Sequence, residues 1–406
     1  MSRDRFQLLT RICRFDDKTT RSERRVTDKF APIRDIFDHF MKNCEQHYTL
    51  SESVTIDETL RKFRGRCPFR VYMPQKPGKY GILFRVITDA RARYVSRMIP
   101  YTGRCEDKAA NSSAQIVRNL TEHIRGSGRN ITMDRYYTTV DLAEELVKER
   151  NLTMLGTLQS NRKGIPEEFK QAKGRDVHST LFAFIGECML LSYVPKKGKV
   201  VLMLSTEHDS PQISDREDQK PQAILDYNEA KGGVDTVDMM IDTYRSKVAK
   251  RRWPMVVWTT MIDIAALNGF LIWRETHPNW EQRRRNAIRF EYLKQLGFQL
   301  IQHQLQARSD VPGLTSCITL AISTVLGKPI PCNDKSSRAQ TTLVSRRRCC
   351  VCVAESKGAG SKKAKYNKAC KVKQICSKCQ KNVCMKHSVK DVICTLCLGS
   401  AEPDSD

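Results

Sequence analysis

The chain has 406 residues, of which 40% are hydrophobic, so it is long and apolar enough for two or three modest domains with cores of their own. Seventy Lys and Arg against 45 Asp and Glu give a formal net charge of +25. This excess favours a polyanionic partner, with nucleic acid ahead of an acidic membrane surface, although a merely solvated basic surface would have the same composition. Residues 1–6 have no apolar h-region, so we expect no secretory signal, and the 16 Cys then favour metal binding over disulfides.

Two apolar stripes at helical spacing occupy residues 1–50, and they predict two helices that pack in a core. The period then changes, because residues 51–160 alternate between β-type and helical segments. Strands are predicted at 53–60, 79–88, 93–100, 130–134 and 152–158, and helices at 111–124 and 141–150. This order of three strands, helix, strand, helix and strand predicts an α/β layer with an antiparallel start and a parallel continuation.

In such a sheet the first and fourth strands can be neighbours, and each ends in a carboxylate, Asp57 or Asp134. This is the ribonuclease H-like arrangement, in which carboxylates hold two Mg²⁺ ions that activate the attacking water or 3′-hydroxyl and stabilise the leaving oxygen. Two alternatives remain at this point. Glu58 could be the ligand in place of Asp57, and acids at strand ends are often turn formers only.

Residues 161–222 interrupt this pattern and are interpreted as a β-rich insertion, with strands at 180–185, 189–194 and 200–205. The segment that follows contains the sequence Lys-Gly-Gly-Val-Asp-Thr-Val-Asp at residues 231–238. Asp235 and Asp238 share one face if this segment is helical, and two glycines would allow a tight turn before it. A solvated helix start is the alternative. A helix here could bring Asp235 beside Asp57 and Asp134, at a site for Mg²⁺ or Mn²⁺, which ligand type alone does not distinguish.

Residues 223–330 are predicted to be mostly helical. The apolar run 253–273 contains Asp263, which would be costly at the centre of a bilayer, so we expect a buried helix and no membrane partner. The stretch 281–308 is basic, and 317–326 is a further apolar segment. The region is either a bundle with a solvated basic face or a platform for the DNA backbone, and the nearby carboxylates favour the platform.

After a basic linker at 331–348, nine of the 16 Cys fall between residues 349 and 397. Four close pairs, each with two intervening residues, supply the eight ligands that two tetrahedral Zn²⁺ ions require. Our preferred interleaved pairing places Cys349, Cys352, Cys384 and His387 at one ion and Cys376, Cys379, Cys394 and Cys397 at the other. Cys350 and Cys370 are left over, and Cys350 could replace Cys349.

Such a short segment with few apolar residues needs metal to fold. A disulfide knot conflicts with the absent secretory signal, and in a RING or PHD module the His falls earlier in the ligand series than the sixth place seen here. The surrounding Lys residues suit DNA or histone tails. Arg346–Arg348 and residues 362–365 also fit nuclear import, so we expect a nuclear protein.

Taken together, these motifs resemble the piggyBac-type transposases and the host proteins derived from them. Residues 55–58 (Thr-Ile-Asp-Glu) followed by 63–69 (Phe-Arg-Gly-Arg-Cys-Pro-Phe) are similar to the first catalytic block of that family. Residues 131–138, with Asp134 before an aromatic pair, resemble the second block, and residues 231–238 the third. The cysteine tail is similar to the cross-brace zinc domain of the family.

The resemblance implies that Asp57, Asp134 and Asp235 are the catalytic triad and that Asp238 is a further essential acid, with all four carboxylates expected as ligands of Mg²⁺. It also implies cleavage and strand transfer of double-stranded DNA through a hairpin at TTAA targets, by a homodimer whose zinc tail binds the transposon end. The alternative is a domesticated, non-catalytic, zinc-containing protein that binds DNA or chromatin. Family members usually carry a longer N-terminus, so the helical domain at residues 1–52 is expected to be partial and dimerisation, DNA binding and activity to be affected.

The resulting expectation is a ribonuclease H-like α/β core with a β-rich insertion, a flanking helical domain and a C-terminal cross-brace zinc domain. The predicted segments begin with a partial dimerisation and DNA-binding domain (1–52), the first part of the core (53–160), the insertion (161–222) and the last core helix (223–244). They continue with a helical dimerisation and DNA-binding part (245–330), the linker (331–348) and the zinc domain (349–398).

Overall fold

The computed structural model describes residues 3–103, 112–246, 251–280, 287–328, 346–355, 370–389 and 393–394. The chain divides into two compact units, Met1–Ile301 and Gln302–Asp406. This division falls within the helical part predicted for 245–330, and the predicted domain boundaries stay predictions.

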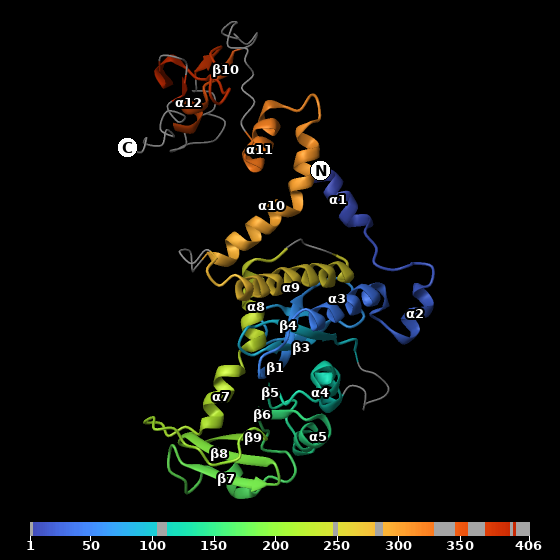
Figure 1. Ribbon diagram of the computed structural model, residues 1–406, viewed down its shortest axis with the longest axis vertical. Coiled ribbons are helices and arrows are strands. Elements are labelled where there is room, and N and C mark those ends of the chain that lie inside the picture. Colours follow the sequence, from blue (N-terminus) through green and yellow to red (C-terminus); the bar gives the residue numbers. More distant parts are fainter. Residues whose placement is uncertain are drawn as a thin grey trace. The chain divides into compact units, whose positions relative to one another are not determined.

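A nine-stranded mixed sheet forms the centre of the first unit (Figure 1). Its strands follow the order β2-β3-β1-β5-β6-β9-β8-β7, and β4 pairs with β3. The strands are β1 (Ser53–Lys62), β2 (Val71–Met73), β3 (Lys79–Asp89), β4 (Val95–Pro100), β5 (Asn130–Met133), β6 (Thr153–Thr157), β7 (Thr180–Ile185), β8 (Cys188–Lys196) and β9 (Lys199–Ser205).

The pairing of β1 confirms the predicted α/β order. β1 is antiparallel to β3, and it is parallel to β5 with Ile56 opposite Met133. β5 is in turn parallel to β6, so the antiparallel start continues into a parallel part. The three strands of the predicted insertion extend this same sheet, because β9 pairs antiparallel with β6.

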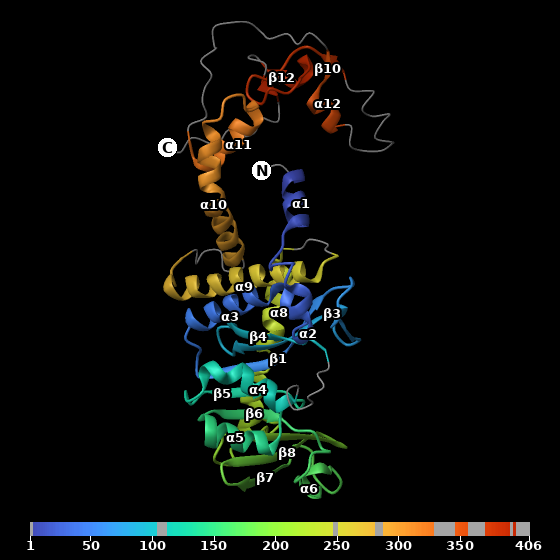
Figure 2. The same ribbon diagram turned by 90° about the vertical axis from the view of Figure 1, so that its right-hand side faces the viewer.

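Several helices of the first unit lie against this sheet or against one another. α8 contacts β1, and α3 contacts β4; Figure 2 shows α3 beside α9. The helices and 3₁₀ turns are α1 (Arg3–Ile12), α2 (Arg21–Thr27), η1 (Ala31–Ile33), α3 (Arg34–Gln46), α4 (Ser113–Thr121), η2 (Glu122–Ile124), α5 (Val140–Arg150), α6 (Glu167–Lys170), α7 (Gln222–Ala230), α8 (Gly233–Thr243), α9 (Trp253–Thr276) and α10 (Ile288–Ser309), which continues past the division between the units.

Local signals account for several helix ends. Ser112 and Thr139 cap α4 and α5, because each hydroxyl accepts a hydrogen bond from a backbone N–H three residues ahead. Asn151 ends α5 in the left-handed conformation, with a φ of 48°. These caps place the turn that holds Asp134 directly between β5 and α5.

The prediction that the first helix packs in the core is wrong. α1 forms where the stripe predicted it, but none of its residues is buried, and Phe6, Leu8 and Ile12 are 52%, 56% and 57% exposed. The apolar residues of this stripe have the spacing of an amphipathic helix, but that spacing does not show whether another element covers the apolar face. The second prediction holds, because Ile33 and Phe37 are buried in the main core.

The long apolar helix α9 packs in the first unit against α3 and α8. By length and composition alone it could cross a membrane, but about half of its most apolar stretch is buried. Its buried polar groups have protein partners: Asp263 accepts from the backbone N–H of Ser246, and Asn268 pairs with both backbone groups of Val95. These contacts are those of a core helix, which confirms the prediction that this run is buried.

The second unit is small. Beyond α10 it contains α11 (Ser316–Leu326), which ends at the left-handed Gly327, and a cysteine-rich module. Cys349, Val351, Cys376, Val383 and Cys384 form the core of that module, so thiols take the place of ordinary apolar side chains. Its elements are β10 (Arg347–Arg348), α12 (Cys350–Glu355), β11 (Lys371–Val372), η4 (Met385–His387), β12 (Ser388–Val389) and β13 (Ile393–Cys394).

Candidate functional site

Asp57 lies inside β1, which continues to Lys62, and Asp134 directly follows the neighbouring parallel strand β5, so only Asp134 lies at a strand end as predicted. Each directly follows a paired residue, because Ile56 of β1 is opposite Met133 of β5. The carboxylate of Asp134 accepts a hydrogen bond from the backbone N–H of Tyr136, and its carbonyl closes the turn that follows. The predicted turn-forming role is therefore present, and it coexists with a placement beside Asp57.

Helix α8 runs over the face of β1 that carries Thr55, Asp57, Thr59 and Arg61, since alternate residues of a strand share a face. Its first residue, Gly233, fits against this face with no room for a side chain: a Cβ there would lie 2.6 Å from the Thr55 hydroxyl. Gly233 is thus the glycine of the pair that allows α8 to pack closely on β1. The pair precedes Asp235, which lies in the first helical turn.

Asp235 is 70% exposed at the side chain and lies 3.5 Å from the ammonium group of Lys76. Lys76 also donates to the backbone carbonyl of Glu58, next to Asp57. Lys76 therefore links Asp235 to the backbone of β1 beside Asp57, and its charge also acts on Asp57. The structure thus brings Asp57, Asp134 and Asp235 to one region of the molecule.

Asp238 points to a different set of partners. Its carboxylate accepts hydrogen bonds from the Thr59 hydroxyl at 2.6 and 2.8 Å and from the Arg61 guanidinium at 2.8 Å. Asp238 is thus held by β1. Its partner Arg61 lies four residues beyond Asp57 on that strand.

The environment of Asp57 suits a divalent cation. The pKa of Asp57 is raised to about 7, mainly by burial and also by the charges of Glu58 and Asp134, whereas the backbone N–H of Glu58 and the charge of Lys76 act in the opposite direction. An oxygen-bound cation would offset this cost, and carboxylates are the ligands that Mg²⁺ and Mn²⁺ accept. These acids do not form a closed ligand shell. Among the described residues, only the cysteine-rich module has three or more Cys, His, Asp or Glu ligand atoms within 4.8 Å of one another.

The alternative ligand Glu58 already has an ion-pair partner of its own. Its carboxylate pairs with Arg85 at 3.0 Å, and Arg85 stacks over the rings of Tyr136 and Tyr137. Glu58 therefore neutralises an arginine that fixes the aromatic pair after Asp134, and Asp57 remains the better candidate ligand on β1.

Ionisation of Asp57 is expected to destabilise the protein when no divalent metal is added. The pKa of this carboxyl is about 7 in the folded chain, against roughly 3.9 when unfolded. The folded state thus holds the proton more tightly, and stability is lost as the pH rises from about 4 to about 7. Asp57→Asn should raise the free energy of unfolding by on the order of 2–4 kcal/mol at pH 8, and progressively less toward pH 4. Urea unfolding across this pH range measures the trend, and a gain that does not vary with pH would contradict it.

The cysteine-rich module brings together the first predicted zinc-ligand set. One ligand atom each from Cys349, Cys352, Cys384 and His387 lies within 4.8 Å of all the others. The His387 Nδ1 atom lies 3.3 Å from the sulfurs of both Cys352 and Cys384. Three thiols and one imidazole fit a structural Zn²⁺ site, although zinc ligation by these residues stays a prediction.

Two residues beside this cluster were missed as participants. The Glu355 carboxylate lies 3.1 Å from His387 Nε2, so it can fix the ring with Nδ1 toward the thiols. The left-over Cys370 has its sulfur 3.4 Å from that of Cys352. Spacing gave no signal for either, because Cys370 is not part of a close Cys pair and Glu355 lies far from His387 in sequence.

The second predicted zinc set is only partly described. Cys376 is buried and Cys379 half-buried in the same small core. Only the backbone of Cys394 is described, and Cys397 lies outside the described residues. The pairing proposed for this second site therefore stays a prediction.

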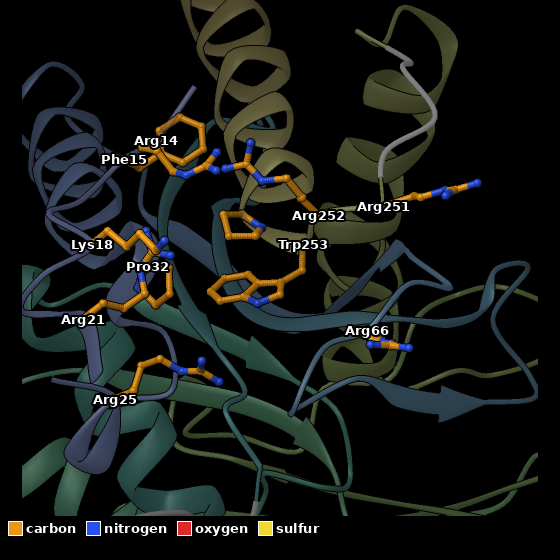
Figure 3. Close-up of a pocket in the computed structure, with 11 residues that line it drawn as sticks. Arg14, Phe15, Lys18, Arg21, Arg25, Pro32, Arg66, Arg251, Arg252 and Trp253 are labelled. Atoms are coloured by element: carbon orange, nitrogen blue, oxygen red, sulfur yellow. The ribbon is translucent and has the colours of Figure 1, made fainter. Parts of the chain in front are cut away.

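A basic pocket of about 280 Å³ lies in the first unit, between the chain before α2 and the start of α9. Figure 3 shows its cationic side chains around the ring of Trp253. A second hollow of about 660 Å³ shares Arg25, Arg66 and Trp253 with it. The cations that line the two hollows are Arg14, Lys18, Arg21, Arg25, Arg64, Arg66, Arg70, Arg251 and Arg252.

Among the residues that the structure describes, no acidic side chain lines either hollow. Arg21 is paired with Asp16, and Arg252 donates to backbone carbonyls. For Arg25, Arg66 and Arg251, the described part of the chain provides no ion-pair partner. This concentration of unneutralised charge suits an anion such as a phosphate group. The sequence placed a basic platform in residues 245–330, whereas most of these arginines come from before residue 71.

Comparisons with known proteins agree with these features. A family model described as transposase IS4 matches residues 1–270. The human (Homo sapiens) piggyBac transposable element-derived protein 2 is 22% identical over 291 residues, which cover 67% of this chain and 48% of the human protein. The chain thus spans about half the length of that curated relative.

A solved structure extends the likeness to nearly the whole fold. It is a cryo-EM structure of the piggyBac transposase synaptic complex with hairpin DNA, and the match covers 98% of this chain and 80% of the solved chain. The two share 34% sequence identity, with a TM-score of 0.75. Since the family model matches more than half of the chain and the solved relative is 34% identical over 80% of its own length, the chain belongs to the piggyBac-type transposase family.

Proposed function

We propose that this protein is a metal-dependent DNA transposase of the DDE/D type that cuts and joins DNA strands at TTAA sites. The observation that carries the proposal is the placement of Asp57 and Asp134 on paired parallel strands, with Asp235 in the first turn of α8, which packs over β1. The solved relative was captured with hairpin DNA, which supports the same class of substrate for this chain.

In this mechanism Asp57, Asp134 and Asp235 would hold Mg²⁺ or Mn²⁺. Such a metal, when bound, would supply activation of an oxygen nucleophile and stabilisation of the charge on the leaving oxygen. The protein's own contribution is to hold the three carboxylates on β1, just after β5 and on α8, and to bury Asp57 so that a bound cation would offset the cost of its negative charge. The raised pKa of Asp57 implies that a proton competes with metal below about pH 7.

The DNA backbone would contact the basic pocket around Trp253, whose arginines have the charge and exposure that phosphate binding requires. Two Zn²⁺ ions would hold the cysteine-rich module, which would contact the transposon end. The assembly would be a homodimer, and the basic runs at Arg346–Arg348 and 362–365 fit a nuclear location.

The decisive experiment is nicking of a duplex that carries TTAA-flanked transposon ends. We expect wild-type protein to cut this duplex with Mg²⁺ or Mn²⁺, to stop in EDTA, and to cut a duplex with a scrambled flank much less. Cleavage of both duplexes alike would remove the TTAA assignment and leave a metal-dependent nuclease. Binding without cleavage under every metal condition would support instead the domesticated, non-catalytic DNA- or chromatin-binding protein.

Loss of two pocket arginines is expected to reduce the salt dependence of DNA binding. Each phosphate contact contributes about 0.9 to the slope of log affinity against log salt, so Arg25→Gln with Arg251→Gln should lower the slope by about 2. The matched control removes two exposed lysines from the β8–β9 hairpin, Lys197→Gln with Lys199→Gln, and should leave the slope nearly unchanged. Fluorescence anisotropy over a salt series measures it, and equal losses in both variants would contradict a role for the pocket.

A further inference from the structure

We propose that Asp238 is a positioning residue, which anchors helix α8 to strand β1 through Arg61 and Thr59 and so sets the place of Asp235. In this assignment the metal ions fall to Asp57, Asp134 and Asp235 alone. The inference rests on the proposed function for the identity of the metal site, but the anchoring itself does not depend on DNA cleavage.

The first support is the geometry of the Asp238 carboxylate. Both of its oxygens accept from the Thr59 hydroxyl, at 2.6 and 2.8 Å, and one also accepts from Arg61 at 2.8 Å. A divalent ion bound to Asp238 would come to rest within a few ångströms of the Arg61 guanidinium. Like charges disfavour that arrangement, so the arginine takes the place that a cation would have.

Burial of Arg61 is the second support. The Arg61 side chain is only 9% exposed, and its Nε atom is buried without a hydrogen-bond partner. Asp238 is the acid that pairs with it in the described part of the chain, while the charge of Asp263 acts from α9. Removal of Asp238 would therefore leave a buried cation without its ion-pair partner, a strongly destabilising change in a metal-free protein as well.

The third support is where the contacts fall along α8. Gly233 packs on Thr55 at the start of the helix, and Asp238 is held by Thr59 and Arg61 farther along the same face of β1. Asp235 lies between these two points. Both ends of the segment that carries Asp235 are thus attached to the strand that carries Asp57, which fixes the spacing of the two carboxylates.

Two titrations of the zinc-loaded full chain test the assignment without DNA. The first is thermal unfolding with no added divalent metal, and the second is calorimetric titration with Mn²⁺. The Arg61→Met variant separates the two roles because they predict opposite signs. If Asp238 is an anchor, loss of Arg61 loosens α8, lowers the unfolding temperature by several degrees and weakens Mn²⁺ binding about 3- to 10-fold.

If Asp238 is instead a metal ligand, Arg61→Met removes a competing cation and Mn²⁺ binds more tightly, which would overturn the proposal. The conservative Arg61→Lys variant should recover much of the unfolding temperature. Asp235→Asn is the reference for a ligand: it should weaken Mn²⁺ binding at least 10-fold and leave the unfolding temperature nearly unchanged.

A paired apolar replacement gives a second, independent reading. Asp238→Leu alone should lower the unfolding temperature, and Arg61→Met combined with Asp238→Leu should restore most of it, because a buried ion pair can be exchanged for apolar packing. The double variant should then bind Mn²⁺ within about 3-fold of wild type. Restored folding with Mn²⁺ affinity as poor as that of Asp235→Asn would overturn the proposal. Unchanged unfolding temperature in both Arg61→Met and Asp238→Leu would overturn the anchor even if no variant, wild type included, bound Mn²⁺.

Discussion

Asp235→Asn is expected to lower metal-dependent DNA cleavage by at least about 1000-fold, because the variant loses one of three carboxylates that hold the metal ions. The change removes one negative charge and keeps the size of the side chain. Asp235 is largely exposed and its ion pair with Lys76 is at the protein surface, so the fold should be unaffected. Nicking of labelled duplex with Mg²⁺, with DNA binding measured in parallel, separates lost chemistry from lost binding.

The same helix provides a matched control. Asp242 also lies on α8, is half-exposed, and pairs with Lys62 and Arg245 as Asp235 pairs with Lys76. Asp242→Asn is therefore the same chemical change two helical turns farther along, away from Asp57. It should keep cleavage within about 3-fold of wild type. Equal loss in the two variants would show that negative charge on α8, rather than a ligand at position 235, supports the reaction.

The central sheet could be predicted because its information is local. The strands around Asp57 and Asp134 have clear β-type periodicity and end at turn residues, and the helix between them has a capping serine. Once those elements are known, the right-handed connection rules bring the first and fourth strands together. The nearness of Asp57 and Asp134 then follows from the pairing of these two strands, although β1 continues past Asp57 to Lys62.

What could not be predicted depends on contacts distant in sequence. The partnership of Arg61 with Asp238 joins residues 177 positions apart, and nothing in the local pattern of β1 separates a buried arginine from an exposed one. The stripe of α1 is a second case, because its periodicity shows a helix but not a neighbour to cover it. The basic pocket is a third, since its arginines come from three segments that are far apart in the sequence.

The thiol cluster makes the second large prediction: the Cys384→Ser variant should lose one of two bound Zn²⁺ ions and the fold around it. Cys384 is buried, and its sulfur lies 3.8 Å from that of Cys352 and 3.3 Å from His387 Nδ1. The apolar core of this module is mostly cysteine, so metal binding, worth on the order of 10 kcal/mol for structural zinc, has to supply the folding free energy. Elemental analysis counts the zinc, and hydrogen exchange measures the loss of protection in residues 346–355 and 370–389.

The four tryptophans at positions 253, 258, 273 and 280 all belong to the first unit, so their fluorescence should stay unchanged and show that the damage is confined to the module. Cys370→Ser is the matched control, since Cys370 is an exposed thiol 3.4 Å from Cys352 but outside the predicted ligand set. It should retain both zinc ions. Zinc lost from Cys370→Ser and kept in Cys349→Ser would make Cys370 the ligand, because three thiols and one imidazole already fill a tetrahedral site and a fourth thiol can enter only by displacing one of them.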